Sequence, residues 1–330
     1  DGIRVKVFCA MSGLVIFIML SRSSQPYFTY ISRRCLRIFP AYLVLLFVSV
    51  LLVDFSINAL VTNPLQTEGN MRRLAILENS KAYFWPHIAA HITMLHTLVP
   101  EEILPAAPYA FLGQAWNLTY EWLFYLCAPF AFWMLTKQPK WVIPILIAYT
   151  VLYFVTRSGF YLPADTAEYS VWFVIGMLSF YLLINIEKIP FRFNNLHALI
   201  LGGLLFFITG QFATTVWAGL LISILARVQN KDEGNLVCKF LVTKPLKYLG
   251  KISYSIYLTH MVALYFAMWV LNHVDLPIYI YALVMMSMTF AGTWILSELL
   301  FTYVEQPAIE FGRTATIRQI PKSAIQPNSE

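Results

Sequence analysis

Long apolar segments, separated by short polar and basic ones, run through most of the chain. They cover residues 5–21, 39–55, 118–136, 141–156, 167–186, 195–209, 212–228, 252–272 and 278–304. Most approach the roughly 20 residues that an α-helix needs to cross a ~30 Å hydrocarbon layer. Because lipid offers the backbone no hydrogen-bond partners, such segments must be helical. The pattern predicts an all-α fold, a polytopic membrane helical bundle with about nine full spans.

The composition supports the membrane class and excludes others. Hydrophobic residues make up 59% of the chain and charged residues 12%, against roughly a quarter charged in soluble domains. The sequence has no phosphate-binding Gly-rich loop and no Gly-x-Ser-x-Gly elbow, which excludes soluble nucleotide hydrolases and serine hydrolases. Four scattered cysteines without a Cys-x-x-Cys pair indicate neither a disulfide framework nor a zinc site.

The basic residues predict the orientation, because cytoplasmic loops collect Lys and Arg. Five regions placed inside hold 17 of the 23 Lys and Arg residues. They are 22–38 with four, 137–140 with two, 187–194 with two, 229–251 together with Arg227 with six, and the chain after 304 with three. Topology therefore explains the net charge of +6, and no nucleic-acid partner is expected. We expect an integral membrane protein with a cytoplasmic C-terminus.

One apolar stretch, 84–99, cannot be a full crossing, since it would invert every later loop. We predict a re-entrant or interfacial helix there, within a long external region, 57–117. The membrane domain would occupy 1–312, followed by a polar, disordered cytoplasmic tail, 313–330. Nine crossings with an inside C-terminus put residue 1 outside, so we expect a further span to precede it.

Two arginines at the cytoplasmic mouth of the second span are candidates for ligand binding. Arg34 and Arg37 are three residues apart, so on a helix they share a face and can bind one polyphosphate or carboxylate together. The tendency of basic residues to lie inside also accounts for both arginines without any ligand. The charge pattern alone leaves both interpretations open.

Glu121 lies near the outer end of the predicted span 118–136, among aromatic residues. An ionised carboxylate in lipid costs a few kcal/mol unless it is paired or faces water, which favours a functional role. The alternative is a buried glutamate that an Arg or Tyr of a neighbouring helix satisfies. Trp116 and Trp122 beside it are equally well interpreted as interface anchors.

A polar stripe runs along the predicted span 252–272. Ser253, Tyr257 and His260 are spaced by four and then three residues, which places them along one face of a helix. Such a stripe must face the bundle interior or a cavity. There it can hold an acyl acceptor, orient a thioester, or only bond to neighbouring helices. Glu298, deeper than Glu305 in the last span, is expected to have a partner.

Three histidines within 84–99 raise the question of a metal site. His87 and His91 are four residues apart, which can place two imidazoles on one face, and His96 follows. There is no His-Glu-x-x-His pattern and no third ligand at a suitable spacing. An interfacial helix with polar residues toward water explains these histidines better, and we expect no metal.

Five short motifs follow one another along nearly the whole chain. They are Phe8-Cys9-Ala10-Met11-Ser12-Gly13, Arg34-x-x-Arg37-Ile38-x-Pro40, Trp116-x-Leu118-x-x-Glu121-x-x-Phe124-Tyr125, Leu249-Gly250-Lys251-Ile252-Ser253-Tyr254-x-x-Tyr257-Leu258-x-His260 and Tyr303-x-Glu305-x-Pro307. Each motif is weak alone. Together, in this order on a polytopic chain, they resemble the membrane-bound acyltransferase 3 family, which includes bacterial O-acetylases of surface polysaccharides.

This resemblance implies ten helices, an acyl donor that enters from the cytoplasm, and an acceptor met at or across the membrane. It implies acyl-CoA binding near Arg34 and Arg37, and a central cavity lined by Glu121, Tyr257 and His260. We therefore consider two predicted catalytic residues, Glu121 and His260, and six predicted substrate-binding residues: Arg34, Arg37, Trp116, Tyr125, Ser253 and Tyr257.

The chain departs from the family pattern in its first helix. The family's first helix carries an arginine and, after it, a histidine that is proposed as the catalytic base. Residues 1–21 contain no such pair, so we expect it in the preceding span. A degenerate paralogue without transferase activity is the alternative. Asn117 and Thr119 also replace small residues that are common in the tryptophan–glutamate motif.

The sequence thus predicts an O-acyltransferase that moves an acyl group, expected to be acetyl, from acyl-CoA to a carbohydrate hydroxyl. The acceptor would be a surface polysaccharide or its lipid-linked precursor, and a base would deprotonate its hydroxyl. Expected partners are acyl-CoA, the acceptor and the lipid bilayer, with no permanently bound cofactor. Two alternatives stay open: a proton-coupled transporter that uses the same cavity, and an inactive scaffold of an envelope-assembly complex.

Overall fold

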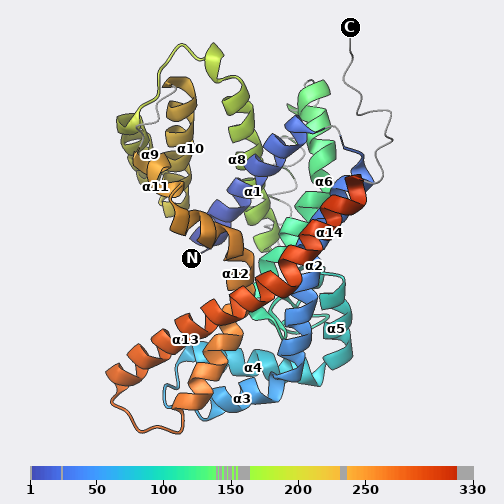
Figure 1. The fold of residues 1–330 in the computed structure, drawn as a ribbon, viewed down its shortest axis with the longest axis vertical. Helices are drawn as coiled ribbons and strands as arrows, with labels where there is room; N and C mark the ends of the chain where they lie inside the picture. Colours follow the sequence, from blue (N-terminus) through green and yellow to red (C-terminus); the bar gives the residue numbers. More distant parts are fainter. Residues whose placement is uncertain are drawn as a thin grey trace. The chain divides into compact units, whose positions relative to one another are not determined.

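The computed structural model describes residues 2–23, 25–138, 140, 143–144, 147, 151, 154, 164–230 and 236–317. Every regular element in these residues is helical and none is a strand (Figure 1), which confirms the all-α class. Five helices of the described chain are long and apolar enough to cross a membrane: Ile3–Arg22, Tyr27–Leu51, Phe212–Asn230, Lys244–Leu271 and Ile278–Thr314. The predicted count of about nine full spans is not confirmed.

The chain divides into two compact units. Unit 1 comprises Asp1–Ser24 and Tyr120–Lys251, and unit 2 comprises Gln25–Thr119 and Ile252–Glu330. Since each unit contains segments from distant parts of the sequence, we describe each one by itself.

In unit 1 the helices follow the predicted apolar segments closely. They are α1 (Ile3–Arg22), α6 (Leu118–Lys137), α8 (Ala164–Ile184), α9 (Asn195–Thr209), α10 (Phe212–Asn230) and the short α11 (Leu236–Leu241), with a 3₁₀ turn η5 (Ile186–Lys188) after α8. The apolar parts of α8 and α9, Glu168–Ile184 and Ile200–Thr209, are shorter than the five helices named above. The predicted span 141–156 lies largely outside the described residues.

Two glycines allow α1 and α8 to pack with their backbones in contact. A Cβ atom added to Gly13 of α1 would meet the carbonyl oxygen of Phe173, and one added to Gly176 of α8 would meet that of Ala10. Small residues at helix interfaces permit this close approach within membranes. The pair therefore fixes how the two helices cross inside unit 1.

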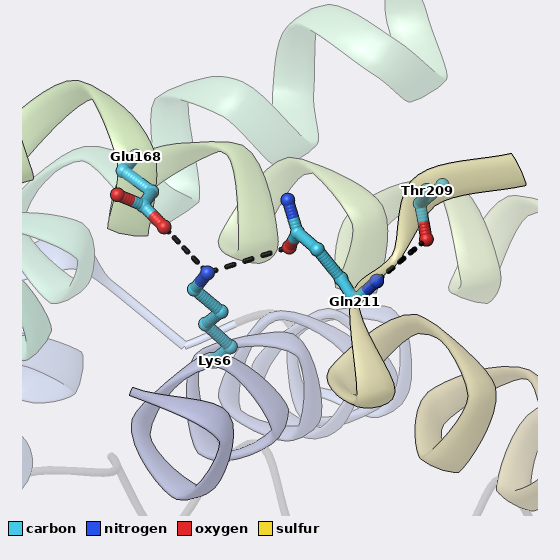
Figure 2. A network of polar contacts seen from close by, with 4 residues as sticks. All are labelled: Lys6, Glu168, Thr209 and Gln211. Atoms are coloured by element: carbon cyan, nitrogen blue, oxygen red, sulfur yellow. Dashed lines mark hydrogen bonds and ion pairs between the residues drawn. The ribbon is translucent and has the colours of Figure 1, made fainter. Parts of the chain in front are cut away.

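A polar network joins α1 to α8 and to the turn between α9 and α10 (Figure 2). Lys6 Nζ lies 2.5 Å from Glu168 Oε1 and donates a hydrogen bond to Gln211 Oε1 at 3.3 Å. The Gln211 backbone N–H donates to Thr209 Oγ1 at 3.1 Å. Lys6 thus has a carboxylate and an amide partner within unit 1.

In unit 2 the first helix is longer than predicted at its start. The basic segment 22–38 was expected to be a loop, but α2 (Tyr27–Leu51) covers most of it. The prediction began the helix where the apolar run begins. A helix can continue into the basic segment, because long arginine side chains can carry their charge to the surface. The far end of the predicted span 39–55 belongs to a separate helix, α3 (Val53–Val61).

The predicted external region 57–117 continues through short helices. They are α4 (Glu68–Ala82), α5 (Phe84–Ile92), η1 (His96–Leu98), η2 (Ala107–Tyr109) and η3 (Gly113–Asn117). At about 1.5 Å per residue, α5 rises only about 14 Å, which agrees with the prediction that 84–99 is not a full crossing. The external location of this region stays a prediction.

Unit 2 is completed by α12 (Lys244–Leu271), whose first residues belong to unit 1, and by α13 (Ile278–Leu300), η6 (Phe301–Glu305) and α14 (Gln306–Ile317). The last three form one continuous helical rod (Figure 1). The first residues of the predicted tail, 313–317, are therefore helical. Residues 318–330 lie outside the described residues.

Candidate active site

Helix α12 organises the candidate site of unit 2, because its polar side chains bond to distant elements. Tyr254 Oη donates to the Ile38 carbonyl oxygen of α2 at 2.8 Å. Ser255 Oγ donates to Glu305 Oε2 of η6 at 2.7 Å. Three of the five sequence motifs therefore meet at α12. They are the arginine motif on α2, the motif on α12 that ends at His260, and the motif on η6 that contains Glu305.

Arg34 and Arg37 lie on α2, so the three-residue spacing does place them on one helical face. The Arg34 guanidinium lies 5.9 Å from the centroid of the Tyr30 ring. Arg37 is exposed and acts electrostatically on Glu305. This face of α2 thus carries two cations, and one of them, Arg37, interacts with the buried Glu305 carboxylate.

Glu305 is the functional candidate that the sequence missed. The sequence places it near the end of the last span, less deep than Glu298 and at little energetic cost, yet it is only 1% exposed. It lies in a π-helical turn, Phe301–Glu305, between two α-helices. Such turns are rare and are frequent at functional sites. Glu298, which was expected to be the deeper residue, is only half-buried.

Tyr257 and His260 form the next part of the α12 stripe. Tyr257 Oη donates to Asn117 Oδ1 of η3. His260 Nδ1 lies 2.8 Å from the Tyr257 carbonyl oxygen. Because a carbonyl can only accept, the neutral His260 ring carries its proton on Nδ1, which leaves Nε2 as an acceptor. Ser253, the first residue of the predicted stripe, is exposed.

A cavity of about 900 Å³ lies entirely within unit 2, with His260 in its wall. Its lining comes from the end of α2 and from α3, α4, the segment 109–114, α12 and α13. This volume falls within the range of about 300–1,000 Å³ that is usual for small-molecule sites. Most lining residues are apolar, and the following polar or charged ones join them: Ser49, Ser56, Arg72, Arg73, Tyr109, Gln114, His260 and Tyr265.

Gln114 is held in the cavity wall by a bond to α12. Its Nε2 donates to the Leu258 carbonyl oxygen at 2.5 Å. Its Oε1 is buried and has no hydrogen-bond partner among the described residues. Phe111, three residues earlier, also lines the cavity and has a φ of 53°. Left-handed backbone at a non-glycine residue is strained and is concentrated at functional sites.

Of the three predicted residues of the tryptophan–glutamate motif, two belong to unit 1 and one to unit 2. Glu121 and Tyr125 are both buried, and Tyr125 Oη donates to Glu121 Oε1 one helical turn away. The alternative to a functional role was a partner on a neighbouring helix, whereas this tyrosine lies on the same helix as Glu121. Trp116, in unit 2, is half-buried, and its carbonyl oxygen accepts from Thr97 Oγ1 at 2.6 Å.

Comparison with known protein families shows which family the chain belongs to. The acyltransferase 3 family model, described as an acyltransferase domain, matches residues 1–298. The chain belongs to the acyltransferase 3 family. No curated protein and no solved structure matches the chain. The family and the apolar helices together make this chain a membrane acyltransferase.

In this acyltransferase, the sequence motifs account for only part of the site. Ser255, Gln114 and Glu305 were not predicted as site residues, and their partners lie far away along the chain. Gln114 bonds to a residue 144 positions on, and Ser255 to one 50 positions on. The π-helical turn also has no signature that could be recognised in a single sequence.

The three histidines of 84–99 form a buried cluster in the same acyltransferase. Tyr42 Oη lies 2.9 Å from His91 Nδ1, and the His91 and His96 rings stack with centroids 4.0 Å apart. Burial lowers the pKa of His87 and His91 below 6.5, and that of His96 from 6.5 to about 4. Among the described residues, no group of three or more His, Cys, Asp or Glu side chains is arranged to hold a metal ion.

The interpretation of these histidines as polar residues facing water was wrong. All three are fully buried, because α5 and η1 pack against the rest of unit 2 rather than lying open to solvent.

Proposed function

We propose that this acyltransferase transfers an acetyl group from acetyl-CoA to a hydroxyl of a carbohydrate, such as a surface polysaccharide or its lipid-linked precursor. The observation that carries this proposal is the position of His260. Its ring is held by the Tyr257 carbonyl oxygen and lines a cavity of about 900 Å³. A histidine fixed in this tautomer is suited to accept a proton at Nε2.

The reaction would proceed by direct attack. The acceptor hydroxyl oxygen forms a bond to the thioester carbonyl carbon, and its proton passes to His260 Nε2. The bond between this carbon and sulfur breaks, and its electron pair leaves with the sulfur. The CoA thiolate then takes up the proton from His260, so the products are an ester and a free thiol. Proton transfer to a positioned base accelerates such reactions roughly 10²–10⁴-fold.

Arg34 and Arg37 are proposed to bind the phosphates of the donor. They share one face of α2, and guanidinium groups bind phosphate oxygens in pairs. Glu305, buried beside Arg37 and bonded to Ser255, would act as a positioning residue that restricts the Arg37 side chain. With these arginines at the cytoplasmic mouth, the donor would come from inside a bacterial inner membrane and the C-terminus would be cytoplasmic.

A thiol-release assay tests the proposal. Protein purified in detergent is given acetyl-CoA and a carbohydrate acceptor, and free thiol is followed over time. We expect saturable release, with the KM for acetyl-CoA raised about tenfold or more in Arg37→Ala, since charge-assisted hydrogen bonds are lost.

Arg33→Gln is the matched control, because Arg33 lies on the same helix as Arg37 and its Nη1 donates to Gln25 Oε1, just before the helix, at 2.9 Å. Its KM should stay close to that of the unaltered protein. Flux of a substrate in proteoliposomes without any thiol release would contradict acyl transfer and favour a transporter.

A further inference from the structure

The cavity beside His260 carries positive charge without any acidic residue in its wall. Arg72 and Arg73 of α4 both line it, and no Asp or Glu does so among the described residues. The two ion pairs found in the described chain, Lys6–Glu168 and Lys81–Asp54, involve neither arginine. The tendency of basic residues to lie inside does not explain Arg72 and Arg73, since the charge pattern places them in the predicted external region.

An aromatic side chain interacts with each of these arginines. The Arg72 guanidinium lies 6.0 Å from the centroid of the Tyr109 ring, and Arg73 acts electrostatically on Tyr265. Both tyrosines also line the cavity. Stacking on an aromatic ring orients a guanidinium while leaving its N–H donors available to an anion.

Most of the remaining wall is apolar, with Leu52, Phe55, Ile76, Ile295 and Leu296 among its residues. An apolar wall lowers the local dielectric and strengthens the field of the two arginines. A ligand that fits this lining needs an extended apolar part as well as an anionic group.

Gln114 and His260 supply the third feature, which is a place for a hydroxyl group. Gln114 Oε1 is buried and lacks a hydrogen-bond partner among the described residues, so it can accept from a ligand hydroxyl. His260 Nε2 is an acceptor for the same kind of group. A buried acceptor left unpaired is destabilising, and a hydroxyl-bearing ligand would relieve this cost.

We propose that this cavity binds the acyl acceptor as an anionic amphiphile. Its phosphate group would lie at Arg72 and Arg73, its apolar chain along the apolar wall, and its hydroxyl group at Gln114 and His260. This inference rests on the proposed function and selects, among carbohydrate acceptors, those attached to a lipid through phosphate.

Binding in detergent tests the inference, with a polyisoprenyl phosphate as the probe and microscale thermophoresis as the measurement. The neutral polyisoprenol of equal chain length and inorganic phosphate are the other two ligands. We expect saturable binding of the polyisoprenyl phosphate, and affinities about tenfold or more weaker for both comparison ligands.

Two arginine variants separate charge from folding. Arg72→Gln/Arg73→Gln should lose the preference for the phosphate over the neutral probe, whereas Arg72→Lys/Arg73→Lys should keep part of it. Lys81→Gln removes a cation from the same helix outside the cavity wall and should bind as the unaltered protein does. All variants are first checked for a monodisperse elution profile.

Equal binding of the polyisoprenyl phosphate and the polyisoprenol would overturn the inference, and so would inorganic phosphate binding as tightly as the amphiphile. Thiol release separates this result from the proposed function. Release that proceeds equally with a neutral acceptor, independently of Arg72 and Arg73, refutes the anionic acceptor and leaves acyl transfer intact. Arginine-dependent binding without thiol release under any condition supports the cavity and refutes acyl transfer.

Discussion

His96 is fully buried and stacks on the ring of His91, with the ring centroids 4.0 Å apart. The backbone of Ala115 is the polar group that favours the charged form of His96, and burial of the ring outweighs it. A charged imidazole has no counter-ion there, and burial lowers the pKa of His96 to about 4. The cluster therefore stays neutral at neutral pH, where it packs as flat polar rings.

The lowered pKa of His96 predicts that the protein loses stability in acid. Between pH 6.5 and about 4, the unfolded chain binds a proton at His96 that the folded chain does not. Stability therefore falls as the pH drops through this window, by up to about 1.4 kcal/mol per pH unit for one histidine. Thermal unfolding in detergent at a series of pH values measures the slope.

His96→Phe provides the control for this slope, because it keeps an aromatic ring and removes the titratable group. The variant should show a shallower decline of Tm with falling pH. An unchanged slope would mean that other groups cause the acid sensitivity.

At the scale of single elements, the turn Phe301–Glu305 has the largest influence on the site. A π-helical turn widens the helix locally, and here it carries a buried carboxylate to a serine of α12. Glu305 Oε1 has no hydrogen-bond partner among the described residues, so the bond from Ser255 to Oε2 is the one that this carboxylate accepts within them.

Ser255→Ala should therefore lower the free energy of unfolding by about 1–3 kcal/mol, since it removes the hydrogen bond from a buried carboxylate. Adding Glu305→Gln should recover part of the loss by removing the buried charge. Ser287→Ala, at an exposed serine of α13, is the control and should change Tm little. Equal Tm values for the two serine variants would contradict this account of Glu305.

The crossing of α1 and α8 makes a second prediction at this scale. Gly13→Ala and Gly176→Ala each place a methyl group against a carbonyl oxygen of the other helix. We expect each to destabilise unit 1 by about 1–3 kcal/mol, because the backbones must separate.

Gly219→Ala in α10 is the matched control, since a Cβ there meets nothing within 4 Å. It should be neutral or stabilise slightly, because alanine favours helices over glycine. Destabilisation of similar size in all three variants would indicate a general intolerance of substitution rather than close packing.

For the whole molecule, hydrophobic patterning predicts the helices well and their contacts poorly. Segments 195–209 and 212–228 match α9 and α10 closely, and Asn194 and Gly210 cap the two ends of α9. The start of α2 was placed too late, since a helix continues past the apolar run that identifies it. The cavity and its arginines were not predicted, because they depend on how α4 packs in unit 2.

The predicted orientation can be tested by cysteine labelling. In a background without Cys9, Cys35, Cys127 and Cys238, a single cysteine is placed at Glu102 or at Lys188, both of which are exposed. A membrane-impermeant thiol reagent added to intact spheroplasts should label Glu102→Cys and spare Lys188→Cys, because basic loops stay inside. Labelling of Lys188→Cys in intact spheroplasts would show that the predicted orientation is inverted.

Transfer of a labelled acetyl group tests acyl transfer most directly. Cells that express the protein from its own locus supply membranes, and these are incubated with acetyl-CoA that carries a labelled acetyl group. We expect the label to enter alkali-labile esters of membrane carbohydrate, and His260→Asn to reduce the rate about 10²-fold or more. Absence of labelled ester with the unaltered protein, or an equal rate in His260→Asn, would contradict the account.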